Sequence, residues 1–488
     1  MKQILWNRKT RYRPYTSWSQ HHIDQLRAHV ATSPWRTQNH IQPFTGLLND
    51  PCAFNYFNGK WHLFYQQYPY GPVHGLKSWH HLTSSDLVTW QDSQGQLLPG
   101  GKYDSHGVYT GSGYVEGSTL HLVYTGNVRD KFWNRHSYQM DAILNTENQV
   151  FKTSQPMIAS VPVGYTNEFR DPYVFDYKKQ RYCLVGSQTQ NRKGTILLYK
   201  QTSHDFWQFR GHIQLPQVLT GYMVECPNIA FVDGHVVLIY CPQGLSRDVL
   251  PYENIYPNIA VIADDIDLVN RKLIGKVSVQ QLDDGFEFYA ARVTDAPDGR
   301  RLLISWIGLP EVNSPTERYG WAHCLSYVRT LHVRDHHLCL SPCKELNKLL
   351  SKHQQQNNAS TITFNNLCGT AEIALKVQAD QQICIKLHAS DSTPLKVLID
   401  TSIGKTVISR LTSHGFFEQR TGCFPAQKNI DLRLFIDESV FECFVDDGFL
   451  CMSGRFYPSA QPQSVIIECI KEIPCIDCWN LERSNDIR

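Results

Sequence analysis

Long apolar runs are missing from this chain of 488 residues, and none approaches the length of about 18 residues that a membrane-spanning helix requires. Charge of one sign is also scarce. The formal net charge is +2 and there is no basic tract, so neither nucleic acid nor a membrane is predicted as a partner. The first residues, MKQILWNRKTRYRPYTSW, lack the apolar core of a secretory signal, and we therefore expect a cytoplasmic protein.

A disulfide framework is absent as well. The 15 cysteines are odd in number and irregularly spaced, which is typical of reduced thiols. The one C-x-x-C pair, Cys475 with Cys478, has no second pair to complete a zinc site, so no metal and no cofactor are predicted. What is abundant is aromatic residues, 24 Tyr, 22 Phe and 11 Trp, which suit β-structure and sites where sugars stack on rings.

The chain contains a repeat with a period of about 55–65 residues. Each unit has β-forming residues on both sides of a turn, and the five units are 54–66, 113–126, 174–187, 230–241 and 294–308. Three of the turns carry Asn-Gly or Asp-Gly, which favour tight hairpins. The spacing leaves room for about four strands per unit, the size of a propeller blade. We predict an all-β fold with a five-bladed β-propeller at 37–345.

The repeat does not extend to the ends of the chain. Within 1–36, the stretch SWSQHHIDQLRAHVATSPW (17–35) predicts a capped helix on the outside of the propeller, as an N-terminal helical extension. Residues 346–488 carry strand-like segments with a shorter period, which predict a C-terminal β-sandwich. The polar segment Lys344–Asn358 is expected to be the linker between the two domains.

Three acidic residues occupy nearly the same position in three of the repeats. Asp50, Asp171 and Glu225 each lie one or two residues before a proline, and eight or nine residues before the turn of their hairpin. A single Asp-Pro is typical of a turn, but three in register predict carboxyls that converge on the propeller axis. Their repulsion would keep one carboxyl protonated near neutral pH. A carboxylic acid beside a carboxylate is what glycoside hydrolysis needs.

Several stretches of this chain resemble glycoside hydrolase family 32, the invertases and fructan hydrolases, and within it the bacterial enzymes that act on sucrose 6-phosphate. They are HIQPFTGLLNDP (40–51), NGKWHLFYQ (58–66), GLKSWHHLTSSDLVTW (75–90), FRDP (169–172), ECPN (225–228), FYAA (288–291), FIDESVFECFVDDG and SGRFYP (453–458). The resemblance implies a five-bladed propeller followed by a β-sandwich. It also implies a retaining β-fructofuranosidase that cleaves sucrose 6-phosphate and sucrose, and the missing export signal favours the phosphorylated sugar.

The same resemblance implies roles for individual residues. Asp50 would be the nucleophile, Glu225 the general acid and then the base, and Asp171 would stabilise the transition state. Retention implies that the two working carboxyls stand about 5–5.5 Å apart. Substrate contacts are implied for a further set of residues: Leu47, Leu48, Asn49, Gln66, Trp79, Tyr109, Thr110 and Arg170.

Other residues of the same stretches have two interpretations each. Arg170 would either help to set which carboxyl keeps the proton or form a structural ion pair. Trp79 and Trp306 are each a candidate sugar platform or a core aromatic. His74 and Lys77 either meet the substrate phosphate or belong to a solvated loop.

The chain departs from the family beside Asp50. Cys52-Ala53 stands where the family has Asn-Gly, and Tyr109-Thr110 where it usually has Phe-Ser. Alanine takes a positive φ less readily than glycine, so we expect a reshaped nucleophile loop or a slower enzyme. A thiol nucleophile at Cys52 is disfavoured, because no activating histidine is beside it. A general invertase or short-fructan hydrolase, and a catalytically weakened sugar-binding propeller, remain as alternatives. The oligomeric state is not predicted.

Overall fold

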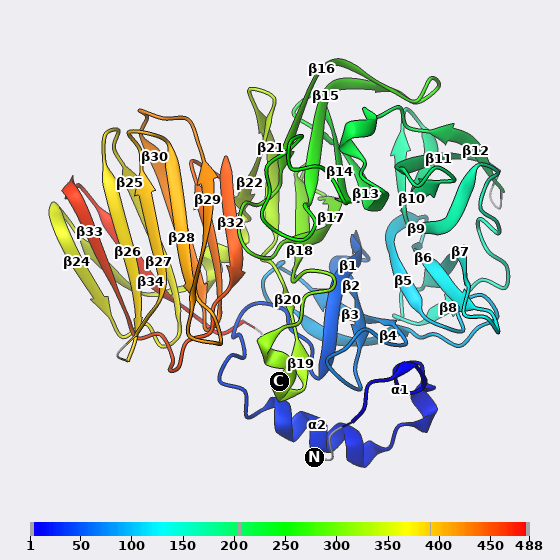
Figure 1. The fold of residues 1–488 in the computed structure, drawn as a ribbon, viewed down its shortest axis with the longest axis horizontal. Helices are drawn as coiled ribbons and strands as arrows, with labels where there is room; N and C mark the ends of the chain where they lie inside the picture. The colour runs from blue at the N-terminus through cyan, green and yellow to red at the C-terminus, as the bar shows by residue number, and fades with distance from the viewer. Residues whose placement is uncertain (1–3, 204–205, 391, 485–488) are drawn as a thin grey trace.

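A computed structural model describes residues 4–203, 206–390 and 392–484, and it contains a propeller of five sheets beside a two-sheet sandwich (Figure 1). Blade 1 contains β1 (Gly46–Phe57), β2 (Lys60–Tyr68), β3 (Ser78–Ser84), β4 (Gln91–Leu97) and β19 (Trp321–Ala322). Blade 2 contains β5 (Val108–Glu116), β6 (Thr119–Arg129), β7 (Arg135–Leu144) and β8 (Val150–Lys152). Blade 3 contains β9 (Tyr165–Tyr177), β10 (Gln180–Thr189), β11 (Gly194–Ser203) and β12 (Phe206–His212).

The remaining two blades follow in chain order. Blade 4 contains β13 (Met223–Val232), β14 (His235–Gln243), β15 (Ile259–Asp267) and β16 (Lys272–Gln281). Blade 5 contains β17 (Tyr289–Asp295), β18 (Arg301–Ile307), β20 (Cys324–Leu325), β21 (Arg329–Arg334) and β22 (His337–Pro342). Short 3-10 helices η2 (Gln217–Leu219) and η3 (Pro315–Tyr319) lie in connections. The predicted five-bladed propeller is therefore confirmed, with each predicted hairpin forming the first two strands of a blade.

The five blades close into a ring through their inner strands. The inner strands β1, β5, β9, β13 and β17 contact one another in that order, and β17 returns to β1. Closure is helped by β19, which comes after blade 5 in the chain but pairs in parallel with β1, at Gly46 with Trp321. In blades 1, 3 and 4, two-residue turns with positive φ at both residues join the inner strand to the second strand, as at Asn58-Gly59. These turns match the twist of the strands, as the Asn-Gly and Asp-Gly signals predicted for blades 1 and 4, whereas Asp298-Gly299 lies in a longer loop, 296–300.

The N-terminal residues form a helical segment against the propeller (Figure 1). It comprises α1 (Arg8–Arg11), η1 (Tyr15–Ser17) and α2 (Gln20–Val30). The side chain of Ser19 caps α2 by accepting a hydrogen bond from the backbone N–H of His22 at 3.2 Å. Leu26 and Val30 bury their side chains against a cluster that includes Trp321. The predicted capped helix is confirmed. No helix of the described residues is long and apolar enough to cross a membrane.

The C-terminal part is a sandwich of two six-stranded sheets. One sheet contains β23 (Leu350–Gln356), β34 (Ile476–Leu481), β25 (Thr370–Val377), β30 (Ile430–Asp437), β31 (Val440–Val445) and β32 (Leu450–Arg455). The other contains β24 (Ala359–Asn365), β33 (Ser464–Ile473), β26 (Gln382–Ala389), β27 (Ser392–Asp400), β28 (Lys405–Leu411) and β29 (Phe417–Cys423).

The expected linker Lys344–Asn358 is corrected by this arrangement. It forms η4 (Lys344–Leu349) and then β23, which pairs with β34 at the edge of the first sheet. Polar side chains misled the prediction because an edge strand exposes much of its surface, whereas its backbone still pairs.

A buried charge network joins the sandwich to the propeller. Arg329 of β21 is completely buried, and its Nη2 lies 2.7 Å from an oxygen of Glu442 in the sandwich, while its Nη1 lies 3.0 Å from Asp283. His40 bridges Glu442 at 3.1 Å and Asp437 at 2.8 Å. Removing one member would leave an unpaired buried charge, which makes the relative position of the two domains costly to change.

Candidate active site

The hydrogen-bond ladder is interrupted at the same level in all five inner strands. The register shifts fall between Leu48 and Pro51 in β1, and at matching positions in β5, β9, β13 and β17. Proline has no N–H to donate, so the prolines after the acidic residues fit these bulges. Asp171 (φ 66°) and Cys226 (φ 49°) even adopt positive φ, which is uncommon outside glycine. The bulges redirect side chains, and these include the three predicted acids.

One cavity collects most of the residues that the sequence predicted. It is lined by Asn49, Asp50, Gln66, Tyr109, Thr110, Arg170, Asp171 and Glu225. The residues come from β1, β2, β5, β9 and β13, so four inner strands contribute. The structure thus brings together the three carboxyls and the polar residues expected to contact a substrate.

Asp50 is held by donors on both of its carboxyl oxygens. Asn49 Nδ2 donates to Oδ1 at 3.0 Å, and the hydroxyl of Thr110 donates to Oδ2. Thr110 in turn accepts a hydrogen bond from Gln66, which leaves its hydroxyl proton free for Asp50. Burial raises the pKa of Asp50, and the charge of Glu225 adds to the rise, whereas the bond from Thr110 opposes it. The carboxylate is therefore oriented and kept ionisable in a cavity that disfavours charge.

Glu225 accepts hydrogen bonds from three side chains. Arg170 places Nε at 3.0 Å and Nη2 at 2.9 Å from Oε1. Gln243 Nε2 and the hydroxyl of Tyr289 each donate to Oε2 at 2.9 Å. Arg170 also pairs with Glu168, so one guanidinium orients two carboxylates. Donors on both of its oxygens fix the direction of the Glu225 carboxyl.

Asp171 is the most deeply buried of the three acids. Its backbone N–H donates to Thr125 Oγ1 at 2.8 Å, and its Oδ2 accepts from the backbone N–H of Cys226 at 2.9 Å. Burial raises the pKa of Asp171 to about 7; Arg170 opposes the rise, and the charges of Glu225 and Asp50 reinforce it. The predicted effect of mutual repulsion is thus present. Asp171 therefore takes up its proton near neutral pH.

The two candidate phosphate contacts occupy different depths. Lys77 is buried, its ammonium donates to Asn49 Oδ1, and burial lowers the pKa of Lys77 to about 7 against the pull of Asp50. It therefore supports the nucleophile side of the cavity and is not part of a solvated loop. His74 is exposed and also lines the cavity.

The structure does not place three of the predicted contacts at the cavity. Leu47, Leu48 and Trp79 are at most 2% exposed and are not among its lining residues. Trp79 donates its indole N–H to the carbonyl of Tyr109 at 3.1 Å and packs in the core between blades 1 and 2. Trp306, the other candidate platform, does line the cavity, and its Nε1 has no partner within the described residues.

The departure at Cys52-Ala53 has a simple structural explanation. Both side chains are fully buried in the core between blades 1 and 2, and neither lines the cavity. Ala53 has no positive φ, so the backbone of this chain does not require a glycine there. Burial and the charge of Asp50 raise the pKa of the Cys52 thiol well above its ordinary value. A protonated thiol is a poor nucleophile.

Several cavity residues escaped the sequence analysis. Tyr12 comes from the N-terminal segment, Arg135 from β7 and Tyr289 from β17. Tyr289 lies in the FYAA stretch, which was a usable signal. Tyr12 and Arg135 had none, because their approach to the cavity depends on how the extension and blade 2 pack.

The comparisons with known proteins agree with this site. The family models for the N-terminal and C-terminal domains of glycosyl hydrolases family 32 match residues 40–342 and 343–472. A sucrose-6-phosphate hydrolase of Pediococcus pentosaceus is 43% identical, over 95% of this chain and 94% of its own. That of Lactococcus lactis subsp. lactis is 38% identical, over 95% and 97%.

Solved structures give the same result. The sucrose-6-phosphate hydrolase from Lactobacillus gasseri superposes with a TM-score of 0.93 at 35% identity, covering 98% of this chain and 100% of its own. A GH32 beta-fructofuranosidase from Bombyx mori, a mutant in complex with sucrose, has a TM-score of 0.82 at 27% identity, covering 96% and 100%. In sequence and in fold, this chain belongs to glycosyl hydrolase family 32.

Proposed function

We propose that this protein is a β-fructofuranosidase that hydrolyses sucrose 6-phosphate, and also sucrose, with retention of configuration. The observation that carries the proposal is the convergence of Asp50, Asp171 and Glu225 on one cavity at the bulges of three inner strands. The names of full-length relatives at 43% and 38% identity support the phosphorylated substrate. A cytoplasmic location belongs to this proposal, because a bilayer excludes a charged sugar phosphate.

In the first step, an oxygen of Asp50 attacks the anomeric C2 of the fructosyl unit. The bond from C2 to the bridging oxygen breaks, and that oxygen takes a proton from Glu225 and leaves with glucose 6-phosphate or glucose. Asp50 suits this role because both of its oxygens are oriented by donors, Asn49 and Thr110. Glu225 suits the acid role because Arg170, Gln243 and Tyr289 fix the direction of its carboxyl.

In the second step, Glu225 takes a proton from water, and the water oxygen attacks C2. The bond between C2 and Asp50 breaks, which restores both carboxyls. Asp171 would bind hydroxyls of the fructosyl ring, since the backbone contact with Cys226 orients its carboxyl at the cavity. Arg170 would hold Glu225 in position through both steps.

The phosphate would lie at the mouth of the cavity. His74 is exposed there, and Arg135 lines the same cavity while pairing with Glu168 at 2.7 Å. Lys77 is a weaker candidate than the sequence suggested, because Asn49 already engages its ammonium group. We therefore assign the phosphate to His74 and Arg135.

The proposal is tested by hexose release from sucrose and sucrose 6-phosphate. Asp50→Asn should lower kcat by about 10⁴ or more, and Glu225→Gln by about 10²–10⁴. Asp176→Asn is the matched control, because Asp176 lies on the same strand as Asp171 but is exposed. It should leave both rates unchanged.

The alternatives predict different results. A sugar-binding propeller would release no more hexose than Asp50→Asn does. A general invertase or short-fructan hydrolase would prefer sucrose or a fructan to sucrose 6-phosphate. If His74→Ala raised KM equally for both sugars, the phosphate assignment would be wrong. Inversion of configuration at C2, detected by nuclear magnetic resonance, would refute the double displacement.

A further inference from the structure

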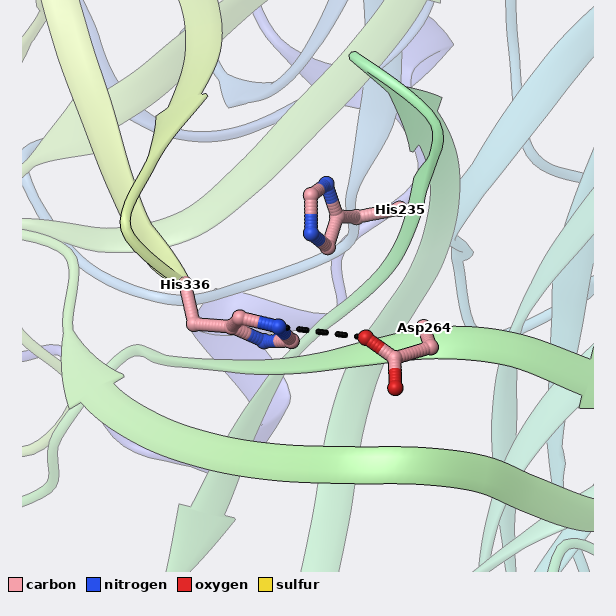
Figure 2. Close-up of side chains that lie close together, drawn as sticks. All are labelled: His235, Asp264 and His336. Carbon is pink, nitrogen blue, oxygen red and sulfur yellow. Dashed lines mark ion pairs between the residues drawn. The ribbon is translucent and has the colours of Figure 1, made fainter.

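Three side chains that could hold a metal ion lie together on the surface of blades 4 and 5, away from the cavity. Figure 2 shows His235, Asp264 and His336 directed toward one another from three different segments. His235 follows the β13–β14 turn, Asp264 lies on β15, and His336 lies in the β21–β22 turn. One ligand atom from each residue lies within 4.8 Å of the other two.

This cluster lies at the end of the propeller opposite the cavity. Glu225 is near the start of β13, and the β13–β14 turn follows the end of the same strand. An extended strand of this length separates the two by about 25 Å. β15 runs in the same direction as the inner strand β13 of its sheet, and β21 in the same direction as the inner strand β17 of its own. Asp264 lies in the second half of β15, and His336 follows the end of β21. The proposed catalytic mechanism uses none of the three residues.

We propose that His235, Asp264 and His336 bind a divalent transition-metal ion of the zinc class, which links blade 4 to blade 5. Two imidazoles and one carboxylate are a donor set that such ions favour, with water completing the coordination. Metal–ligand bonds of about 2.0–2.1 Å in a tetrahedron separate the ligand atoms by about 3.3 Å. Asp264 Oδ1 and His336 Nε2 are already 3.1 Å apart. The ligand atom of His235 lies within 4.8 Å of both.

The surrounding contacts orient these ligands. Asp264 Oδ2 accepts the backbone N–H of Lys276 at 2.8 Å, which directs Oδ1 toward the cluster. His235 Nδ1 lies 3.0 Å from the carbonyl of Asp233, so Nδ1 carries the proton and Nε2 keeps its lone pair. A histidine that donates its other N–H to a carbonyl is the usual arrangement beside a metal.

The backbone of the β21–β22 turn places the third ligand. Asp335 (φ 54°) and His336 (φ 60°) form its two central residues, a conformation that most non-glycine residues avoid. His336 is further held by the bond from Ser278 to its carbonyl at 2.6 Å. Its Nδ1 is buried and has no partner among the residues the structure describes, so Asp264 is the main polar anchor of the ring.

A bound ion would tie together residues about 100 positions apart in the chain, on two neighbouring blades. Cross-links that close long loops restrict the unfolded chain most, so the ion should stabilise the folded propeller. The proposed ion therefore has a structural role and leaves hydrolysis unchanged.

The test uses the full chain, stripped with a chelator and titrated with Zn²⁺ by calorimetry. Wild type should bind one more equivalent than His235→Ala and His336→Ala, or bind it at least about 100-fold more tightly. His353→Ala is the matched control, because His353 pairs with Asp477 at 2.7 Å on the sandwich but belongs to no three-ligand group among the described residues. It should bind like wild type.

Metal binding by cysteine thiols and effects of the substitutions on folding are each tested separately. Co²⁺ should give d–d absorption without the thiolate charge-transfer band that cysteine ligands produce. His336→Ala should remove this d–d absorption. Zn²⁺ should raise the Tm of wild type and of His353→Ala but not of the isosteric Asp264→Asn. Equal stoichiometry and equal Tm shifts in all variants, or a thiolate band that the substitutions leave intact, would overturn the proposal. Sucrose hydrolysis should be the same in all of them.

Discussion

The hydroxyl of Thr110 offers the sharpest test of how the cavity controls Asp50. It accepts a hydrogen bond from Gln66 and donates one to Asp50 Oδ2, so the hydroxyl proton points at Asp50. Thr110→Val keeps the shape of the side chain and removes this donor, together with the acceptor for Gln66. A carboxylate that loses a donor is less stable in its ionised form, so the pKa of Asp50 should rise above its already raised value.

The size of the effect follows from the kind of bond. A hydrogen bond to a charged group contributes about 1.5–3 kcal/mol, and one pKa unit corresponds to about 1.4 kcal/mol. The acid limb of kcat/KM should therefore move up by about 1–2 pH units. Below that limb the rate falls by about 10–100-fold relative to wild type, because the nucleophile must be ionised. Well above it, the two rates converge.

The assay is the pH profile of kcat/KM on sucrose for wild type, Thr110→Val and Thr110→Ser. Serine retains the hydroxyl and is the residue that the family usually has there, so its acid limb should coincide with wild type. An acid limb that does not move in Thr110→Val would refute the role of the donor. An equal shift in Thr110→Ser would assign the effect to packing by the methyl group.

Three further predictions concern other parts of the molecule. Asp171→Asn should abolish hydrolysis. It should also stabilise the fold by about 2–4 kcal/mol at pH 8, because the pKa of Asp171 is raised to about 7 in the folded protein. This gain in stability, measured by thermal unfolding, should shrink as the pH falls below 7 and vanish near 4. A gain independent of pH would contradict this origin. Cys52→Ala should retain wild-type kcat, and thiol alkylation should not inactivate the folded enzyme, since Cys52 is buried away from the cavity; inactivation that Cys52→Ala prevents would argue otherwise. Arg329→Met should cost about 3–5 kcal/mol in urea unfolding, because the buried carboxylates of Glu442 and Asp283 lose their shared guanidinium partner. The more exposed Arg301→Met should change the free energy of unfolding by less than about 0.5 kcal/mol, and similar losses in both variants would contradict the network's role.

Much of the fold could be predicted from the sequence because its signals are local. A turn such as Asn58-Gly59 needs positive φ at adjacent residues, and the alternating strands on either side must pair across it. The linker prediction failed at β23 because pairing at the edge of a sheet leaves no strong side-chain pattern.

The site was predictable to a smaller extent. Asp50, Asp171 and Glu225 were found through their equal distance from a turn, which is again a local measure. The indoles of Trp79 and Trp306 could not be separated in this way. Trp79 is fully buried between blades 1 and 2, and Trp306 lines the cavity, although both stand among similar β-forming residues.

The sequence by itself determined the five hairpins, the capped N-terminal helix and the three acids in register, because each depends on backbone preferences over fewer than about a dozen residues. The tertiary structure decided which side chains meet. It placed Tyr12 at the cavity, gave the proton of the Thr110 hydroxyl to Asp50, and set His235 beside His336. These contacts join segments far apart in the chain, and their distances are fixed only when the blades close into a ring.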